Sequence, residues 1–272
     1  MKRAFALALN VFLVCINAHI VSAEDTAAAF LERARSATAK YQDQSIAILE
    51  GYRRIGRDFP TMGEHWIRLD LLFDGRVDAE HPEVLTYISV DGKAKLTGIA
   101  YALPLLPGES PPDLPASRHA WHDHFRTIED ETVLPVHHLS GESSSGPRIA
   151  MLHAWLSLPN PDGVFAADNW AIPYARLGLP PPEHVSRSAA AALSLLTGGV
   201  EHFTATVDGI ASPAERQRAL VNAAFATARS AVERDIQENG AAGLSDIWSH
   251  LRQSLEAVID PKHWNSLKAV LP

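Results

Sequence analysis

The sequence predicts an α+β fold with an N-terminal helix, an antiparallel β-sheet or partial barrel in the middle, and a C-terminal helical segment. Two observations lead to this prediction. Between residues 60 and 175 the apolar side chains tend to alternate with period two, whereas after Pro180-Pro181-Pro182 they recur with the helical period of about 3.6. In addition, Asp91-Gly92 supplies the positive φ angles of a two-residue hairpin turn.

Residues 25–50 are expected to form the N-terminal helix, and Gly51 follows its last turn, where glycine commonly ends a helix. Its apolar positions recur at roughly helical spacing, namely at Phe30, Ala34, Ala37, Tyr41 and Ile48.

The middle of the chain is expected to contain at least two paired strands. Residues 84–90 and 93–102 flank the Asp-Gly turn and should pair antiparallel. Residues 65–69 alternate, and residues 148–158 are apolar on both faces, which indicates a strand buried on both sides. Five prolines fall within residues 104–115, which we expect to form a loop because proline removes backbone donors.

The C-terminal segment carries apolar stripes at helical spacing. Ser212-Pro213-Ala214-Glu215 is typical of a capping box with proline at the first helical position, and Asn239-Gly240 should end that helix. Asp260-Pro261 should start a short last helix. The two clearest stripes are Leu196, Val200, Phe203, Val207 and Ile210, and then Leu244, Trp248, Leu251, Leu255 and Val258.

The first 23 residues have the layout of a cleavable signal peptide. Basic Lys2-Arg3 precedes an apolar run that ends in the small residues Val21-Ser22-Ala23, and acidic Glu24 follows at once. A membrane helix is disfavoured because no basic cluster follows, and lipidation is disfavoured because Val14 precedes Cys15. We therefore expect a periplasmic or secreted protein, with an α+β domain over 24–179 and a C-terminal helical segment over 180–272.

Composition excludes several classes of function. Loss of the signal peptide would remove the only cysteine and change the formal net charge from −8 to −10. An acidic chain without cysteine disfavours nucleic-acid partners, thiol catalysis and thiolate metal sites. No further membrane span, P-loop, GxGxxG turn or GxSxG elbow is found, so no nucleotide cofactor is expected.

Histidine is the unusual feature of the composition. The chain has 13 histidines, and only His19 falls in the signal peptide. His122 and His124 would share one face of an extended strand, and His153 lies in the segment expected to be buried. The central part of the chain contains most of them: His65, His81, His119, His122, His124, His137, His138 and His153.

Imidazole is a good ligand for zinc or copper, so we consider a transition-metal site formed by His65, His122, His124 and His153. Glu64 and Asp123 would orient these imidazoles through hydrogen bonds. Met151, two residues before His153, would share its strand face and slightly favours copper. For each histidine taken alone, a hydrogen bond to a carbonyl or carboxylate is the commoner explanation.

Four short motifs occur in order along the middle of the chain: Met62-Gly63-Glu64-His65-Trp66, Pro82-Glu83-Val84-Leu85-Thr86-Tyr87, Leu152-His153-Ala154-Trp155 and Asn160-Pro161-Asp162-Gly163-Val164-Phe165. In order and spacing, over roughly residues 38–170, they resemble those of a family of uncharacterised exported bacterial proteins. The resemblance implies that His65 and His153 belong to a shared pattern, and it implies no reaction. Ser157 replaces a tryptophan of that pattern.

Three functions follow as hypotheses. The first is an exported protein that binds a transition-metal ion through the histidine cluster. The second is a metal-dependent enzyme of unknown substrate, in which three histidines leave a coordination position open. The third is a non-catalytic structural envelope protein, for instance a homo-oligomer, whose histidines lie in its core or interfaces.

Overall fold

The computed structural model describes residues 27–114, 120–124 and 148–272, and for Asp123 and His124 it describes the backbone alone. The predicted signal peptide, the predicted loop over 140–147, His119, His137 and His138 lie outside the described residues. Among the described residues, no helix is both long and apolar enough to cross a bilayer.

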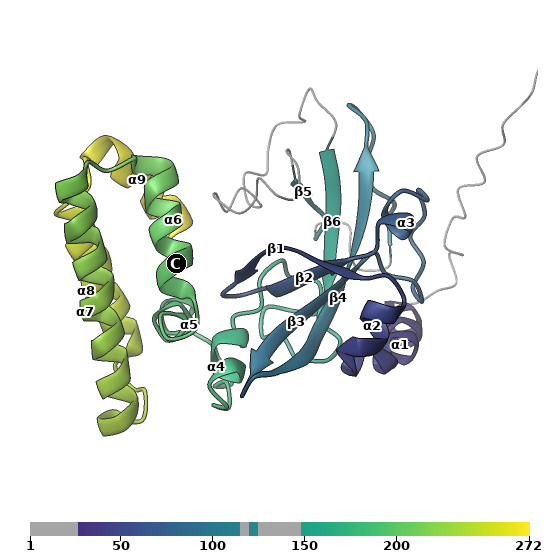
Figure 1. Ribbon diagram of the computed structural model, residues 1–272, viewed down its shortest axis with the longest axis horizontal. Coiled ribbons are helices and arrows are strands. Elements are labelled where there is room, and N and C mark those ends of the chain that lie inside the picture. The colour runs from purple at the N-terminus through teal and green to yellow at the C-terminus, as the bar shows by residue number, and fades with distance from the viewer. Residues whose placement is uncertain (1–26, 115–119, 125–147) are drawn as a thin grey trace, which may run out of the picture.

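The described chain is an α+β fold, as predicted (Figure 1). The N-terminal half contains α1 (Ala27–Thr38), the 3-10 helix η1 (Ala39–Gln42), α2 (Gln44–Leu49), β1 (Arg53–Phe59), β2 (Gly63–Ile67), α3 (Leu69–Leu72), β3 (Val84–Val90), β4 (Lys93–Leu105) and β5 (His122–His124). The rest contains β6 (Arg148–Ala154), α4 (Ile172–Arg176), α5 (Arg187–Ser194), α6 (Gly199–Ala211), α7 (Glu215–Asn239), α8 (Leu244–Glu256) and α9 (Pro261–Val270).

The described strands form one antiparallel sheet in the order β1-β2-β3-β4-β6-β5. The hairpin at Asp91-Gly92 is confirmed, since both residues have positive φ, 49° and 73°, and Val90 pairs with Lys93. Residues 150–154 of β6 are buried, as expected, because Leu152 and Ala154 pack in the same core as Phe30 of α1 and Met151 packs on the opposite face.

The two faces of the sheet have different cover. The side chains of Leu85, Tyr87, Ile99 and Tyr101 pack on one face against Phe30 of α1 and its neighbours in η1 and α2. On the opposite face, Phe59, Ile88 and Trp155 pack with Ile172 of α4. In Figure 1 the helices α5–α9 stand beyond α4, on the other side of the sheet from α1 and α2.

The C-terminal helices have a core of their own, and their predicted apolar stripes are confirmed. Phe203, Val207 and Phe225 are buried with Trp248, Leu251 and Leu255 between α5 and α9. Gly240 ends α7 with a positive φ of 62°, and Asp260 caps α9 by accepting a hydrogen bond from the backbone nitrogen of Lys262.

Two helix predictions need correction. Residues 25–50 do not form one helix, because the Asp43 side chain accepts a hydrogen bond from the backbone nitrogen of Ser45 and starts α2 afresh. The capping box at Ser212 is also wrong. Ser212 has a positive φ of 42°, α7 begins at Glu215, and Gln217 accepts a hydrogen bond from the Ala214 nitrogen.

The strand boundaries also differ from the predictions. β4 continues to Leu105, although Pro104 was placed in a loop. The hydrogen-bonded ladder between β4 and β3 ends at Ala100. Pro104 lies beyond that point, so β3 needs no backbone donor from it. The strand from Arg148 ends at Ala154 instead of Leu158. β1 was not predicted, because its sequence is charged and it lies at the edge of the sheet.

Candidate functional site

Three of the four predicted ligand histidines come together on the face of the sheet that is turned away from α1. The ring centroids of His65 and His153 are 5.5 Å apart, and those of His122 and His153 are 5.3 Å apart. His65 and His153 are 8% and 1% exposed. We call His65, His122 and His153 the imidazole cluster.

Curvature of the sheet makes this approach geometrically feasible. β2 and β6 are separated by β3 and β4, which in a flat sheet would put them about 14 Å apart. The sheet must therefore curl so that both strands lean over a concave face. Small residues line that face between the two rings, since His65 pairs with Thr86, Thr86 with Gly98, and His153 with Ala100.

The ring of His153 is held by a backbone carbonyl. Its Nδ1 lies 2.6 Å from the oxygen of Ala167. A carbonyl can only accept, so Nδ1 carries the proton, and the neutral ring has its lone pair on Nε2. The carbonyl of Ala166 accepts from Trp155 Nε1 at 2.7 Å, and that of Asp168 accepts from Asn160 Nδ2 at 2.8 Å. Three side chains of the sequence motifs thus form hydrogen bonds with the backbone carbonyls of three successive residues, 166, 167 and 168.

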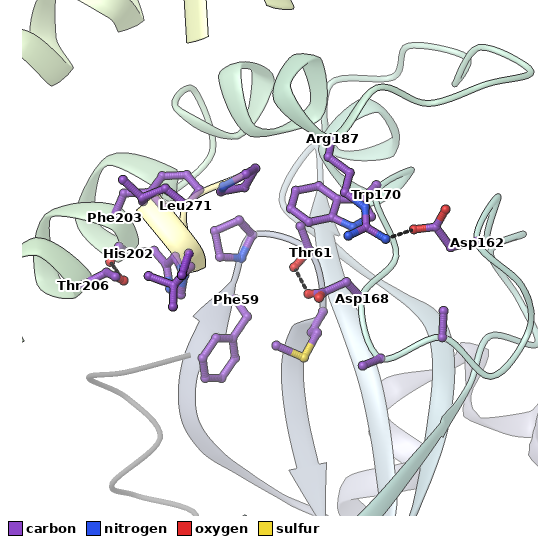
Figure 2. A pocket seen from close by; sticks show the side chains of 17 residues that line it. Phe59, Thr61, Asp162, Asp168, Trp170, Arg187, His202, Phe203, Thr206 and Leu271 are labelled. Carbon is purple, nitrogen blue, oxygen red and sulfur yellow. Dashed lines mark hydrogen bonds and ion pairs between the residues drawn. The ribbon is translucent and has the colours of Figure 1, made fainter. Parts of the chain in front are cut away.

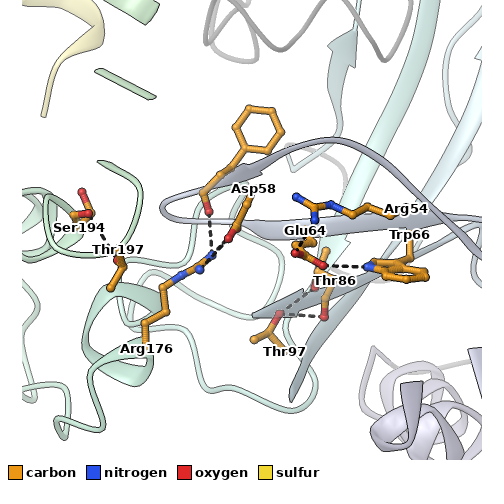
Figure 3. A network of polar contacts seen from close by, with 10 residues as sticks. Arg54, Asp58, Glu64, Trp66, Thr86, Thr97, Arg176, Ser194 and Thr197 are labelled. Carbon is orange, nitrogen blue, oxygen red and sulfur yellow. Dashed lines mark hydrogen bonds and ion pairs between the residues drawn. The ribbon is translucent and has the colours of Figure 1, made fainter. Parts of the chain in front are cut away.

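The remaining predicted site residues are not brought to the cluster. Glu64 lies on the opposite face of β2, where it pairs with Arg54 at 2.9 Å and accepts from Trp66 Nε1 (Figure 3). The side chains of Asp123 and His124 are not among those described. Met151 lies opposite His122 in the ladder of β5 and β6, so both point to the concave face.

The donor atoms do not already form a metal site. Among the side chains that the structure describes, no three His, Cys, Asp or Glu residues form a group that could hold a metal ion as they stand. His153 lies 5.5 and 5.3 Å from the other two rings of the imidazole cluster, and the ring nitrogens would have to turn toward a common point to share an ion.

A cavity of about 720 Å³ lies beside the cluster, between the sheet and the C-terminal helices (Figure 2). Phe59 and Ala167 belong to its wall and also contact the cluster, through the ring of His65 and through Nδ1 of His153. None of the three clustered histidines lines it. Its wall includes Phe59, Thr61, Met62, Asp162, Asp168, Trp170, Arg187, His202, Phe203, Thr206 and Leu271.

His202 lies in the wall of this cavity and is not among the histidines singled out from the sequence. Its ring packs edge-on against Phe59 at 5.9 Å and against Phe203 at 5.2 Å. Burial lowers the pKa of His202 to about 4, against the opposing effect of the Asp168 carboxylate, so the ring is neutral near pH 7. Asp168 itself accepts a hydrogen bond from the Thr61 hydroxyl at 2.5 Å.

Fold and site together define an α+β protein with an imidazole cluster on the concave face of its sheet. No family model, curated protein or solved structure matches the chain. The functional argument therefore starts from the geometry of the cluster.

Proposed function

We propose that the protein binds a transition-metal ion, zinc or copper, through His65, His122 and His153. The observation that carries the proposal is the convergence of three imidazoles from β2, β5 and β6, some ninety positions apart in sequence. In the predicted exported location, such a site would serve metal binding in the cell envelope or outside the cell.

The spacing of the rings supports a shared ion. With zinc–nitrogen bonds of about 2.0–2.1 Å, the ring centroids of two imidazoles on a tetrahedral ion lie about 5 Å apart. The observed separations are 5.5 and 5.3 Å. Since Ala167 holds Nδ1 of His153, the ligand atom of that ring would be Nε2, and a carbonyl in this position is a common support for a ligating histidine.

His124 remains part of the proposal as a fourth ligand. His122 and His124 belong to the same strand, and the alternation expected from the sequence would put both on one face. Met151, opposite His122, would add a thioether, which favours copper(I) over zinc. Substitution of Met151 by leucine therefore separates the two metals: copper affinity should fall, and zinc affinity should stay within about threefold.

A metal-dependent enzyme is the second candidate, favoured by the cavity and by Asp168 in its wall. Phe59 and the stretch around Ala167 lie between that cavity and the imidazole cluster. A substrate in the cavity would therefore have no direct contact with an ion held by the cluster. For this reason metal binding without catalysis is the leading proposal.

Metal analysis of the full chain tests the proposal. The protein is produced without a polyhistidine tag, purified without chelators and examined by elemental mass spectrometry. About one equivalent of zinc or copper is expected. His122→Ala and His153→Ala should abolish retention, whereas the control His250→Ala, on the exposed face of α8, should keep it.

His122 is only partly buried, so its variant should fold even if His153→Ala does not. A folded wild-type protein that retains no metal and gives no heat on titration with zinc or copper would contradict the proposal. That outcome would leave the hypothesis of a structural envelope protein.

A further inference from the structure

The cavity between the sheet and the C-terminal helices has the properties of a small-molecule site. Its volume of about 720 Å³ falls within the usual range of roughly 300–1,000 Å³ for such sites. Figure 2 shows the apolar side chains of Phe59, Trp170, Phe203 and Leu271 around a common space, with Phe59 contributed by the sheet. An aromatic ligand would therefore meet apolar surface on both sides.

His202 supplies the polar group that such a ligand needs. Its ring lies in the wall between Phe59 and Phe203, and no hydrogen bond of its ring nitrogens is found among the described residues. A neutral imidazole offers one donor and one acceptor. A hydroxyl group on the ligand can use either of them.

The charges in the wall select against an anion. Asp162 is paired with Arg187 at 3.1 Å, and the guanidinium of Arg187 also lies 5.8 Å from the ring centroid of Trp170. Asp168 also belongs to the wall, so the described lining residues carry no excess of positive charge that would attract an anion. A neutral His202 adds no positive charge.

We propose that this cavity binds an uncharged aromatic molecule with a hydroxyl group, which forms a hydrogen bond with His202. The site is distinct from the imidazole cluster and does not depend on metal binding. Its lining comes from the sheet, from the loop after β6 and from the C-terminal helices, so the ligand would bridge the two halves of the chain.

Competition binding with the full chain tests the proposal. The dye N-phenyl-1-naphthylamine, which is uncharged and brightens in apolar sites, is displaced by 1-naphthol, naphthalene, 1-naphthoate or 1-naphthylmethylamine. 1-Naphthol should compete best. In His202→Phe, which keeps an aromatic ring, the affinity ratio of 1-naphthol to naphthalene should fall about 5- to 10-fold, the effect of one neutral hydrogen bond. His250→Phe should leave the ratio unchanged.

A second variant tests the location of the site. Ala269→Trp, in α9 on the helical side of the wall, places a large ring in the cavity and should reduce dye and 1-naphthol binding at least tenfold, while elemental analysis still finds the metal. The proposal fails if the dye does not bind, or if 1-naphthoate or the ammonium compound competes better than 1-naphthol. An unchanged 1-naphthol-to-naphthalene ratio in folded His202→Phe also overturns it. If that variant does not fold, His202→Leu, which also has no hydrogen-bonding group, takes its place in the same comparison.

Discussion

Among single residues, Glu83 combines deep burial with a titratable group. Its side chain is 1% exposed at the start of β3, and its Oε2 accepts a hydrogen bond from the backbone nitrogen of Ala102 at 3.0 Å. Burial raises the pKa of Glu83 to about 8, although that hydrogen bond acts in the opposite direction. At neutral pH the folded protein therefore holds a proton here that the unfolded chain has released.

The sign of the pH dependence follows from this difference. The folded-state pKa lies above the unfolded value of 4.5, so the stabilisation is complete below about pH 4.5 and is lost as pH rises toward 8. Glu83→Gln keeps an acceptor for Ala102 and removes the titration. We expect it to exceed the wild type in stability by about 4 kcal/mol at pH 8.5, and to match it at pH 4.5.

Urea unfolding at the two pH values measures this effect, and Glu80→Gln, at an exposed position nearby, is the control. If the stability difference between Glu83→Gln and wild type is the same at both pH values, the buried-proton account is wrong.

His202 shows why part of the site could not be predicted. His65, His122 and His153 were singled out because strand alternation and local density are visible in sequence. His202 lies beside the apolar stripe of α6, and its burial comes from Phe59 on a distant strand. Local periodicity carries no signal for such a contact. The hydrogen bond from His153 to Ala167 was equally hidden, because it depends on how the chain returns after β6.

At the level of elements, β4 closely approaches the end of β6, and this approach positions the imidazole cluster. A Cβ atom on Gly98 would lie 2.7 Å from the carbonyl oxygen of Ala154 and 3.2 Å from Trp155. The sequence identified the hairpin, because the Asp-Gly turn and the alternating strands agree. It did not reveal the curvature, which depends on small residues that face one another from different strands.

Gly98→Ala is therefore expected to push β6 away from β4. We expect a loss of about 2–4 kcal/mol of stability and weaker metal retention, since His153 is attached to the displaced strand. Gly92→Asn, in the hairpin turn with open space around it, should cost well under 1 kcal/mol, because Asn tolerates positive φ. Thermal unfolding and metal analysis of both variants make the comparison. Equal losses would mean that the contact at Gly98 has no special role.

At the level of the whole molecule, α4 joins two separate cores. Ile172 packs with the strand residues, whereas Trp170 and Tyr174 pack with the C-terminal helices. Arg176 at the end of α4 pairs with Asp58 of β1 and donates to the carbonyl of Phe59 (Figure 3). Its side chain is 5% exposed, so this ion pair is far more protected than a surface one. The pair ties the helical segment to the cavity wall at Phe59.

Arg176→Ala should therefore loosen the helical segment from the sheet. Loss of one partner leaves the carboxylate of Asp58 half-buried without its guanidinium, at a cost of about 2 kcal/mol. Trp248 lies in the helical core and Trp155 in the sheet core, so single-tryptophan versions of the protein report on each half separately. In the Arg176→Ala background the two urea transitions should separate, and dye binding in the cavity should weaken.

Arg187→Ala breaks an exposed ion pair with Asp162 and should cost less than 1 kcal/mol, with coincident transitions. Coincident transitions in both variants would mean that the two cores are coupled by apolar packing at α4 alone.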